Sequence, residues 1–166
     1  MVDIYKELAD LGITYERYDH APVFTCDEAD SVVPDHDAVQ TKNLFLRDKR
    51  GRRHVLLVTT CAKAVDIKKF ADQIGADNLS FGSAERMEKY LGVTPGSVTV
   101  LGLIADTTNA VELYVDADVW SIDKWRCHPL INSATLVLSR ADVERFLART
   151  GHSPRVLTIA IRADSA

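Results

Sequence analysis

The spacing of apolar residues changes several times along the chain, and each change indicates a different element of structure. Apolar residues three or four positions apart, as at Ile4, Leu8 and Leu11, are typical of a helix with one buried face. Alternating or continuous apolar runs, as in VQTKNLFLRD and HVLLVTT, are typical of strands. The expected helices cover residues 3–11, 65–74, 84–91 and 139–150, with a further short helix opening at Thr25. The expected strands cover residues 13–20, 39–48, 54–60, 97–106, 110–118, 133–139 and 155–161.

Polar caps and glycines mark where these elements begin and end. Thr25 followed by Glu28 is a capping box, and Ser83 can cap the helix that Gly92 ends. Strands outnumber helices, and short turns such as DKRGRR and TTN join neighbouring strands. The pattern therefore predicts an α+β fold with a mixed, mostly antiparallel twisted sheet surrounded by helices. A doubly wound fold needs a regular alternation of strand and helix, which this chain lacks.

The composition is that of an ordinary globular protein. The 166 residues fit a single domain spanning residues 1–166, with 46% hydrophobic and 27% charged residues. No apolar run approaches the roughly 20 residues needed to span a bilayer. The opening MVDIYKELADLG lacks the basic-then-apolar pattern of a signal peptide, so we expect a cytoplasmic protein with no membrane partner. A net charge of −4 argues against gripping nucleic acid over a wide surface, but not against a local basic patch.

The cysteines and histidines lack the spacing of known reactive sites. Cys26, Cys61 and Cys127 lie far apart with no CxxC pair, so we expect reduced thiols and neither a disulfide framework nor a zinc site. No HxH, HExxH, GxSxG, GxxxxGK[ST] or GxGxxG pattern occurs, so no metal or cofactor is expected. Cys127 and His128 are adjacent, and in an extended segment their side chains would point to opposite sides.

Lys42 and a glycine-rich turn are the first two candidate features. Lys42 interrupts the apolar segment VQTKNLFL, where its ammonium group could bind an anion in a cleft. It could equally be an edge-strand or snorkelling lysine. In GVTPGSVTVLG, Pro95 and Gly96 can form a tight turn whose N–H groups could hold a carbonyl oxygen or a phosphate. A helix cap followed by a plain turn into a strand explains the same residues.

Two further segments carry polar residues in unusual positions. In WRCHPLINSAT, His128 precedes Pro129 and is biased to an extended backbone, and Asn132 interrupts an apolar stretch. A loop histidine that hydrogen-bonds the backbone is the alternative. The segment RDKRGRRH, residues 47–54, has five Lys or Arg in eight positions. Such a run is either a solvated hairpin tip or a contact for a phosphate backbone.

Together these segments resemble the YbaK/prolyl-tRNA synthetase-associated editing family. The resemblance covers nearly the whole chain in the family's order, through VFT-x-x-EA at residues 23–29, KNLFLRD, GVTPGSVT and CHPLINSAT. One departure is Val100-Leu101, where many relatives carry Pro-Phe. The resemblance implies a metal-independent hydrolase that removes a wrong amino acid from tRNA. Free-standing members clear alanine from tRNA(Pro), which is needed because a proline pocket cannot exclude the smaller alanine strongly.

The resemblance also assigns roles to residues of this chain. Lys42 takes the place of the family's key lysine, which would hold the terminal phosphate or ribose and orient the ester. The residues expected to bind the substrate are His128, Asn132, Gly92, Pro95, Gly96 and Ser97. The basic run separately predicts that Arg50, Arg52 and Arg53 meet the tRNA backbone. The expected partner is the acceptor end of tRNA(Pro) carrying alanine, and prolyl-tRNA synthetase is a further candidate. Two alternatives stay open: a deacylase for Cys- or Ser-charged tRNA, and a non-catalytic module that binds tRNA or a synthetase.

Overall fold

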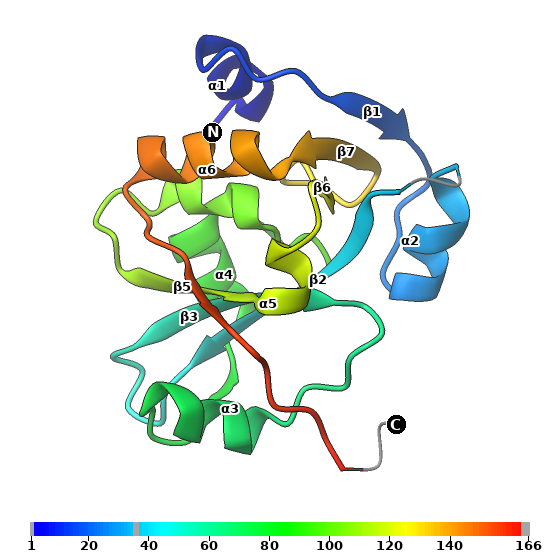
Figure 1. Ribbon diagram of the computed structural model, residues 1–166. Helices are drawn as coiled ribbons and strands as arrows, with labels where there is room; N and C mark the ends of the chain where they lie inside the picture. Colours follow the sequence, from blue (N-terminus) through cyan, green and yellow to red (C-terminus); the bar gives the residue numbers. More distant parts are fainter. Residues whose placement is uncertain (1, 35–36, 164–166) are drawn as a thin grey trace.

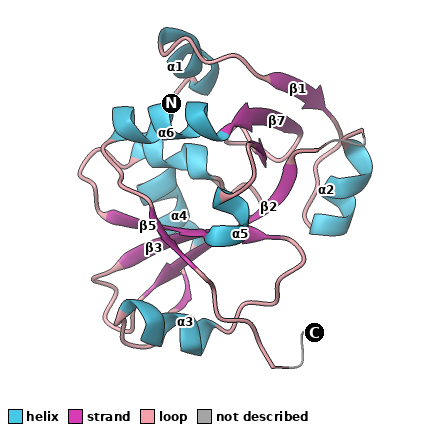
Figure 2. Cartoon of the chain, viewed as in Figure 1, coloured by secondary structure: helices cyan, strands magenta, loops and turns pink. Residues whose placement is uncertain are grey.

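In the computed structural model, which describes residues 2–34 and 37–163, helices surround a mixed β-sheet (Figure 1). The helices are α1 (Ile4–Asp10), α2 (Cys26–Val32), α3 (Ile67–Ile74), α4 (Ala84–Leu91), η1 (Val100–Ala105, a 3₁₀ helix), α5 (Ala117–Trp120) and α6 (Arg140–Thr150). The strands are β1 (Glu16–Asp19), β2 (Val39–Arg47), β3 (His54–Thr60), β4 (Ser80–Phe81), β5 (Val111–Asp116), β6 (Lys124–Cys127), β7 (Ala134–Ser139) and β8 (Arg155–Leu157). Figure 2 shows the two kinds of element in the same view.

The strands are ordered β1-β7-β6-β2-β3-β5-β8, and β4 pairs with β2 outside this path. The pairs β1–β7, β6–β7, β2–β3 and β2–β4 are antiparallel. The pairs β2–β6, β3–β5 and β5–β8 are parallel. The α+β class and the mixed sheet predicted from the sequence are therefore confirmed.

Strand β2 joins the two halves of this sheet. Its first residues, Val39 and Gln40, pair with β6, and its later part pairs with β3 in a register that places Lys42 opposite Thr59. The predicted hairpin of β2 and β3 is thus confirmed. Because β2 is shared, the polar residues at its start lie where the two halves of the sheet meet.

The two faces of the β2–β3 region belong to different hydrophobic clusters. Phe45 and Leu56 pack in the larger cluster with residues of α1, α4, α6 and η1. Leu46 and Leu57 pack in a smaller cluster with Phe70 of α3. Successive strand residues point to opposite faces, so each neighbouring pair divides its side chains between the two clusters. Figure 1 shows α3 on the opposite side of β3 and β5 from α6.

The predicted caps form as hydrogen bonds. The Ser83 hydroxyl accepts from Arg86 N at 3.2 Å, and α4 ends at Gly92 with a left-handed φ of 65°. The Thr25 hydroxyl accepts from Glu28 N at 3.1 Å and opens α2. The Glu28 carboxylate accepts from the N–H of Phe24, one residue before the usual position in a capping box. Local side-chain to backbone bonds therefore set these helix ends.

Three predicted strands differ from the structure, the first being β1, which covers only Glu16–Asp19 of the predicted residues 13–20. Residues 97–106 do not form a strand: Val100–Ala105 is a 3₁₀ helix that Thr99 caps, with its hydroxyl 3.3 Å from Leu101 N. Its side chains from Val100 to Leu103 are buried, and an apolar run buried on all sides gives no periodicity that separates a strand from a helix. The closing strand is shorter than residues 155–161, because β8 ends at Leu157.

The expectation of three reduced cysteines is wrong. Cys26 and Cys61 form a disulfide with their Cα atoms 5.8 Å apart, although 35 residues separate them in the sequence. Sequence distance gave no sign of this pairing, because the fold brings the start of α2 beside the end of β3. Cys127 is the free cysteine among the described residues, and its burial raises the pKa of its thiol to about 12.

Candidate functional site

A cavity of about 270 Å³ lies between α2 and β2. Residues 23–26 and Ala29 form one wall, and residues 40–45 of β2 form the opposite one. Phe81, Met87, Gly96, Val98 and His128 complete the lining. The cavity therefore combines an apolar wall with a lysine, an asparagine and a histidine, the mixture found in sites that bind small polar groups.

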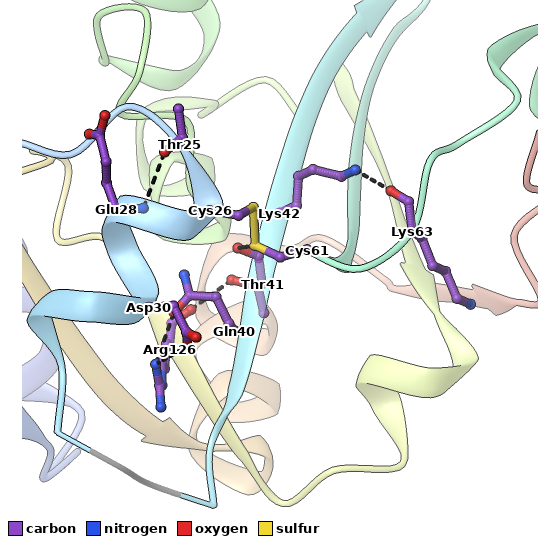
Figure 3. Close-up of a disulfide and its surroundings, with 10 residues drawn as sticks. All are labelled: Thr25, Cys26, Glu28, Asp30, Gln40, Thr41, Lys42, Cys61, Lys63 and Arg126. Atoms are coloured by element: carbon purple, nitrogen blue, oxygen red, sulfur yellow. Dashed lines mark hydrogen bonds and ion pairs between the residues drawn. A yellow bond between two sulfur atoms is a disulfide. The ribbon is translucent and has the colours of Figure 1, made fainter. Parts of the chain in front are cut away.

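Lys42 lines this cavity from the middle of β2 and is partly buried. Its Nζ donates a hydrogen bond to the carbonyl oxygen of Lys63, and Figure 3 shows the side chain extended toward that residue. Burial of the side chain is the main cause that lowers the pKa of Lys42, and the positive charge of Arg162 lowers it further. An ammonium group carries three donors, so the two that Lys63 does not use can serve an anionic or polar ligand.

The acceptor of Lys42 is itself anchored. The ammonium of Lys63 lies 2.7 Å from Asp116 Oδ2 and 2.8 Å from Asp118 Oδ2. The Thr59 hydroxyl donates to the buried Asp116 carboxylate at 2.6 Å. A fully buried carboxylate with these partners holds the turn after β3 in one position, and hence it holds the Lys63 carbonyl that orients Lys42.

Asn43 follows Lys42 and also lines the cavity. Its Oδ1 is buried and has no hydrogen-bond partner in the part of the chain that the structure describes. A buried acceptor without a partner costs roughly 1–3 kcal/mol, and a group that donates to Oδ1 when a ligand binds beside Asn43 would relieve this cost. No sequence motif assigns Asn43 a role. A signal was present, since a second polar residue followed Lys42 in an otherwise apolar strand.

His128 lines the cavity from just after β6, the strand that pairs with the start of β2, and is partly buried. Its Nδ1 lies 3.2 Å from the carbonyl oxygen of Ala134, which can only accept, so the bond requires a proton on Nδ1. Burial is the main cause that lowers the pKa of His128; the bond to Ala134 raises it, and the charge of His20 lowers it. The ring is therefore neutral at pH 7 with Nε2 as an acceptor.

Three loops meet at one end of the cavity. Asn132 exchanges two hydrogen bonds with Val23, one from its Nδ2 at 3.0 Å and one to its carbonyl oxygen at 3.1 Å. Gly96 has a φ of 88°, and a Cβ there would lie 3.0 Å from the ring of Phe24. A larger residue at Gly96 would thus be strained and would displace Phe24.

The remaining turn residues have other surroundings. The N–H of Ser97 already donates to the carbonyl of Thr94 at 3.0 Å, and Ser97 is buried. Pro95 is exposed between them and does not line the cavity. Gly92 lines a separate apolar groove beside α1. Among the four predicted turn residues, the structure thus brings Gly96 to the cavity.

The basic hairpin lies at the far end of β2, about 16 Å along the strand from Lys42. Arg50 and Arg52 are exposed there. Arg53 is instead held by Glu112 through two bonds of 2.7 and 2.8 Å, and it also donates to carbonyls at the end of α3. Its guanidinium is therefore part of the fold, and Arg50 and Arg52 are the two arginines presented to solvent.

Residues 2–34 and 37–163 contain no group of three or more His, Cys, Asp or Glu side chains that could hold a metal ion. No helix in the same ranges is long and apolar enough to cross a membrane.

The chain matches the model of the aminoacyl-tRNA editing domain over residues 20–146. It belongs to this family, so the resemblance seen in its motifs is confirmed. This match and the fold make it an aminoacyl-tRNA editing protein, the class of hydrolase that cleaves the ester of a mischarged tRNA.

Relatives and solved structures agree with this class. The prolyl-tRNA editing protein ProX of Acetoanaerobium sticklandii is 35% identical over 94% of this chain and 95% of its own. The prolyl-tRNA synthetase associated domain-containing protein 1 of Danio rerio is 34% identical over 95% of this chain and 88% of its own. A crystal structure of a candidate trans-editing enzyme for prolyl-tRNA synthetase has the same fold, with a TM-score of 0.72, 18% identity and coverage of 96% of this chain and 95% of that one.

Proposed function

We propose that this protein acts in trans to hydrolyse alanine from mischarged tRNA(Pro), with the cavity between α2 and β2 as its active site. The observation that carries the proposal is the cavity itself, whose lining brings together Lys42, His128 and Gly96 from separate motifs of the family. The printed names of the relatives, which refer to prolyl-tRNA editing and to prolyl-tRNA synthetase, support the choice of tRNA. A cytoplasmic location is part of the proposal, because charged tRNA is used there in translation.

Lys42 anchors the terminal nucleotide in this scheme. Two of its ammonium donors bind the phosphate or the ribose hydroxyl, while the third stays on the Lys63 carbonyl. This fixes the ester in the cavity at a constant position relative to β2. Positioning of this kind can supply several kcal/mol, and the aminoacyl ester is activated enough to need little more.

In this scheme the ammonium group of the alanine donates hydrogen bonds to Asn43 and His128. His128, whose Nε2 is an acceptor, lines the cavity, and Asn43 Oδ1 is a buried acceptor of a second lining residue, whereas the substrate α-ammonium has three donors and no acceptor. Proline has a secondary amine with one donor fewer and a ring that needs more room. In this scheme Phe45 and Met87 in the wall limit the room for the proline ring, and the hydrogen bonds favour the primary ammonium of alanine.

Hydrolysis then needs a water and a place for the developing negative charge. Water attacks the ester carbonyl carbon, and the tetrahedral oxyanion takes a hydrogen bond from the backbone of Gly96. The C–O bond to the ribose breaks, the ribose oxygen takes a proton, and alanine leaves as the free acid. Asn132 and Val23 keep the Gly96 turn, Phe24 and the start of α2 in register.

The test is a multiple-turnover deacylation assay with tRNA charged with alanine, cysteine, serine or proline. We expect many equivalents of Ala-tRNA(Pro) to be cleared per protein and Pro-tRNA(Pro) to persist. If Cys-tRNA or Ser-tRNA is deacylated faster than Ala-tRNA(Pro), the protein is specific for that amino acid instead of alanine. Binding without turnover would leave a tRNA- or synthetase-binding module and overturn the proposal.

A further inference from the structure

Helix α2 forms a wall of the cavity but is weakly attached to the rest of the fold. It has seven residues, and Ala29 is the buried side chain within it. Neither hydrophobic cluster of the described residues contains a residue of α2. Figure 1 shows the helix at one side of the molecule, away from α1, α4 and α6. Burial of apolar surface, the main force that holds a helix in place, is therefore small for α2.

The polar contacts of α2 add little. Asp30 lies 3.4 Å from Nη1 of the buried Arg126, but its own side chain is 74% exposed. Water screens the exposed carboxylate, so this long contact holds the helix weakly. The bond between Glu28 and Phe24 is local and ties the helix only to the residue before its cap.

The disulfide adds a covalent attachment to the helix itself, whose flanking residues Val23 and Val33 are buried on either side of it. Cys26 is the first residue of α2, and Cys61 is the first residue after β3 (Figure 3). The bond joins the helix covalently to the central hairpin. Both cysteines are partly exposed and line a shallow surface pocket, so a reducing thiol can reach the bond.

The same turn that carries Cys61 also carries the acceptor of Lys42. Cys61 N donates to the carbonyl of Gln40 at 3.3 Å, and two residues later the Lys63 carbonyl accepts from Lys42. Because Lys63 is pinned by the buried Asp116, this turn stays in place when the disulfide opens. Reduction thus frees α2 and leaves the turn where it is.

We propose that Cys26 and Cys61 are a redox-reversible clamp: their disulfide holds α2 against the cavity, and reduction by a dithiol releases the helix. The effect of this clamp on deacylation rests on the proposed function. The chemistry is thiol–disulfide exchange. A thiolate of the dithiol attacks one sulfur and breaks the S–S bond, and its second thiolate resolves the mixed disulfide. Two electrons and two protons end on Cys26 and Cys61, and the reductant leaves as its own disulfide.

The reduced state has a place for its new polar group. Cys61 Sγ lies 3.5 Å from the carbonyl oxygen of Thr41, so the Cys61 thiol can donate to it once the disulfide is open. In a cytoplasmic protein, disulfides are usually transient or redox-sensing rather than permanent, which fits a clamp that opens and closes.

Cys127 provides the matched control. It is fully buried, and burial raises the pKa of its thiol, so it reacts slowly with thiols and disulfides. The variants are therefore Cys61→Ala, which removes the clamp from outside the cavity, and Cys127→Ala, which removes the unpaired thiol. Alkylation followed by mass spectrometry establishes the redox state of each sample.

The first measurement is amide hydrogen exchange on the full chain, air-oxidised or reduced with dithiothreitol. We expect exchange of residues 26–33 to be about tenfold or more faster after reduction, because local opening then lacks the covalent restraint. Residues 60–63 should change much less. Oxidised Cys61→Ala should match the reduced protein, whereas Cys127→Ala should keep the redox response.

The second measurement is deacylation of Ala-tRNA(Pro) under both conditions. We expect KM to rise about three- to tenfold on reduction with a smaller change in kcat, since an ordered wall mainly lowers the cost of binding. Equal α2 exchange in both redox states, a pair that does not oxidise, or a response retained in Cys61→Ala would overturn the clamp. Different exchange with an unchanged KM would overturn its link to catalysis. Absence of deacylation in every sample would refute the proposed function, and exchange would still decide the clamp.

Discussion

The middle of β2 and the hairpin turn that follows it carry polar groups in opposite states. At the hairpin end, Arg53 forms two bonds with Glu112, and the Asp48 carboxylate accepts from the N–H groups of Arg52 and Arg53 at 2.8 and 3.1 Å. In the middle of the strand, the buried Asn43 Oδ1 has no partner among the described residues.

The difference teaches how to tell structural from functional polar groups in this fold. Groups whose partners are all within the chain stabilise it, and a buried group without a partner on a cavity-lining residue is a candidate for a functional role. Mutations at the hairpin end, the satisfied end, should lower the stability of the fold. Mutations beside the cavity should lower the activity.

The largest expected effect is the loss of activity in Lys42→Ala. Without the anchored ammonium the ester is no longer held in place, so kcat/KM for Ala-tRNA(Pro) should fall by about 100-fold or more. Thermal unfolding should change little, because the side chain lies at the cavity edge. Lys42→Arg serves as the matched control for charge: it should restore little activity, since a guanidinium cannot reproduce the bond to Lys63. Deacylation as fast as in the wild type would remove Lys42 from the site.

Asn43→Ala sharpens the comparison on the same side. The substrate ammonium loses an acceptor, so kcat/KM should fall by about 10- to 100-fold. Stability should stay equal or rise, since the mutation removes a buried acceptor that lacks a partner. Asn43→Asp keeps an acceptor and should retain more activity than Asn43→Ala. A clear loss of stability in Asn43→Ala would show that the residue is structural.

The pH profile tests His128 at the cavity. Protonation of Nε2 would remove the acceptor, so kcat/KM should fall as the pH drops. Burial lowers the pKa of His128, so the midpoint should lie below the ordinary value of 6.5. Below the midpoint the fall should approach about tenfold per pH unit. In His128→Gln, which does not titrate, this limb of the profile should flatten after subtraction of spontaneous hydrolysis.

At the satisfied end, Arg53→Ala should reduce stability rather than activity. Removal of the guanidinium leaves the partly buried Glu112 without its closest cation, and the free energy of unfolding should fall by about 1–3 kcal/mol. Denaturant unfolding measures this loss, with exposed Arg50→Ala as the matched control expected to change stability by about 0.5 kcal/mol or less. A raised KM for tRNA with unchanged stability would contradict the structural role.

The smallest effect concerns the exposed tip of the hairpin. The double variant Arg50→Ala with Arg52→Ala should weaken tRNA binding several-fold. The slope of log K against log salt should decrease by about 1 to 2, because up to two phosphate contacts are lost. Filter binding over a series of salt concentrations measures the slope. An unchanged slope would make the tip a solvated turn.

Much of the fold was predictable because its signals are local. The caps at Thr25 and Ser83 and the glycine at Gly92 depend on residues three or four positions away. The hairpin of β2 and β3 follows from two apolar runs and a short polar turn. The 3₁₀ helix η1 was missed, because its residues are buried all round and show no period.

The candidate site divides in the same way. Lys42, His128 and Gly96 were predicted from motifs, and the structure brings all three to one cavity. Asn43 was missed because its importance lies in a missing partner, which no sequence pattern displays. Arg53 was expected at the tRNA backbone, but its partner Glu112 lies on β5, far away in the sequence.

The sequence by itself therefore determined most of the longer elements, the family and the residue types available for catalysis, since periodicity, capping and motifs act over short distances. Only the tertiary structure decided which of these residues meet. The disulfide between Cys26 and Cys61, the unsatisfied oxygen of Asn43 and the lowered pKa of Lys42 depend on burial and on neighbours remote in the chain. Such properties arise from distances and desolvation in the folded state, and local sequence carries neither.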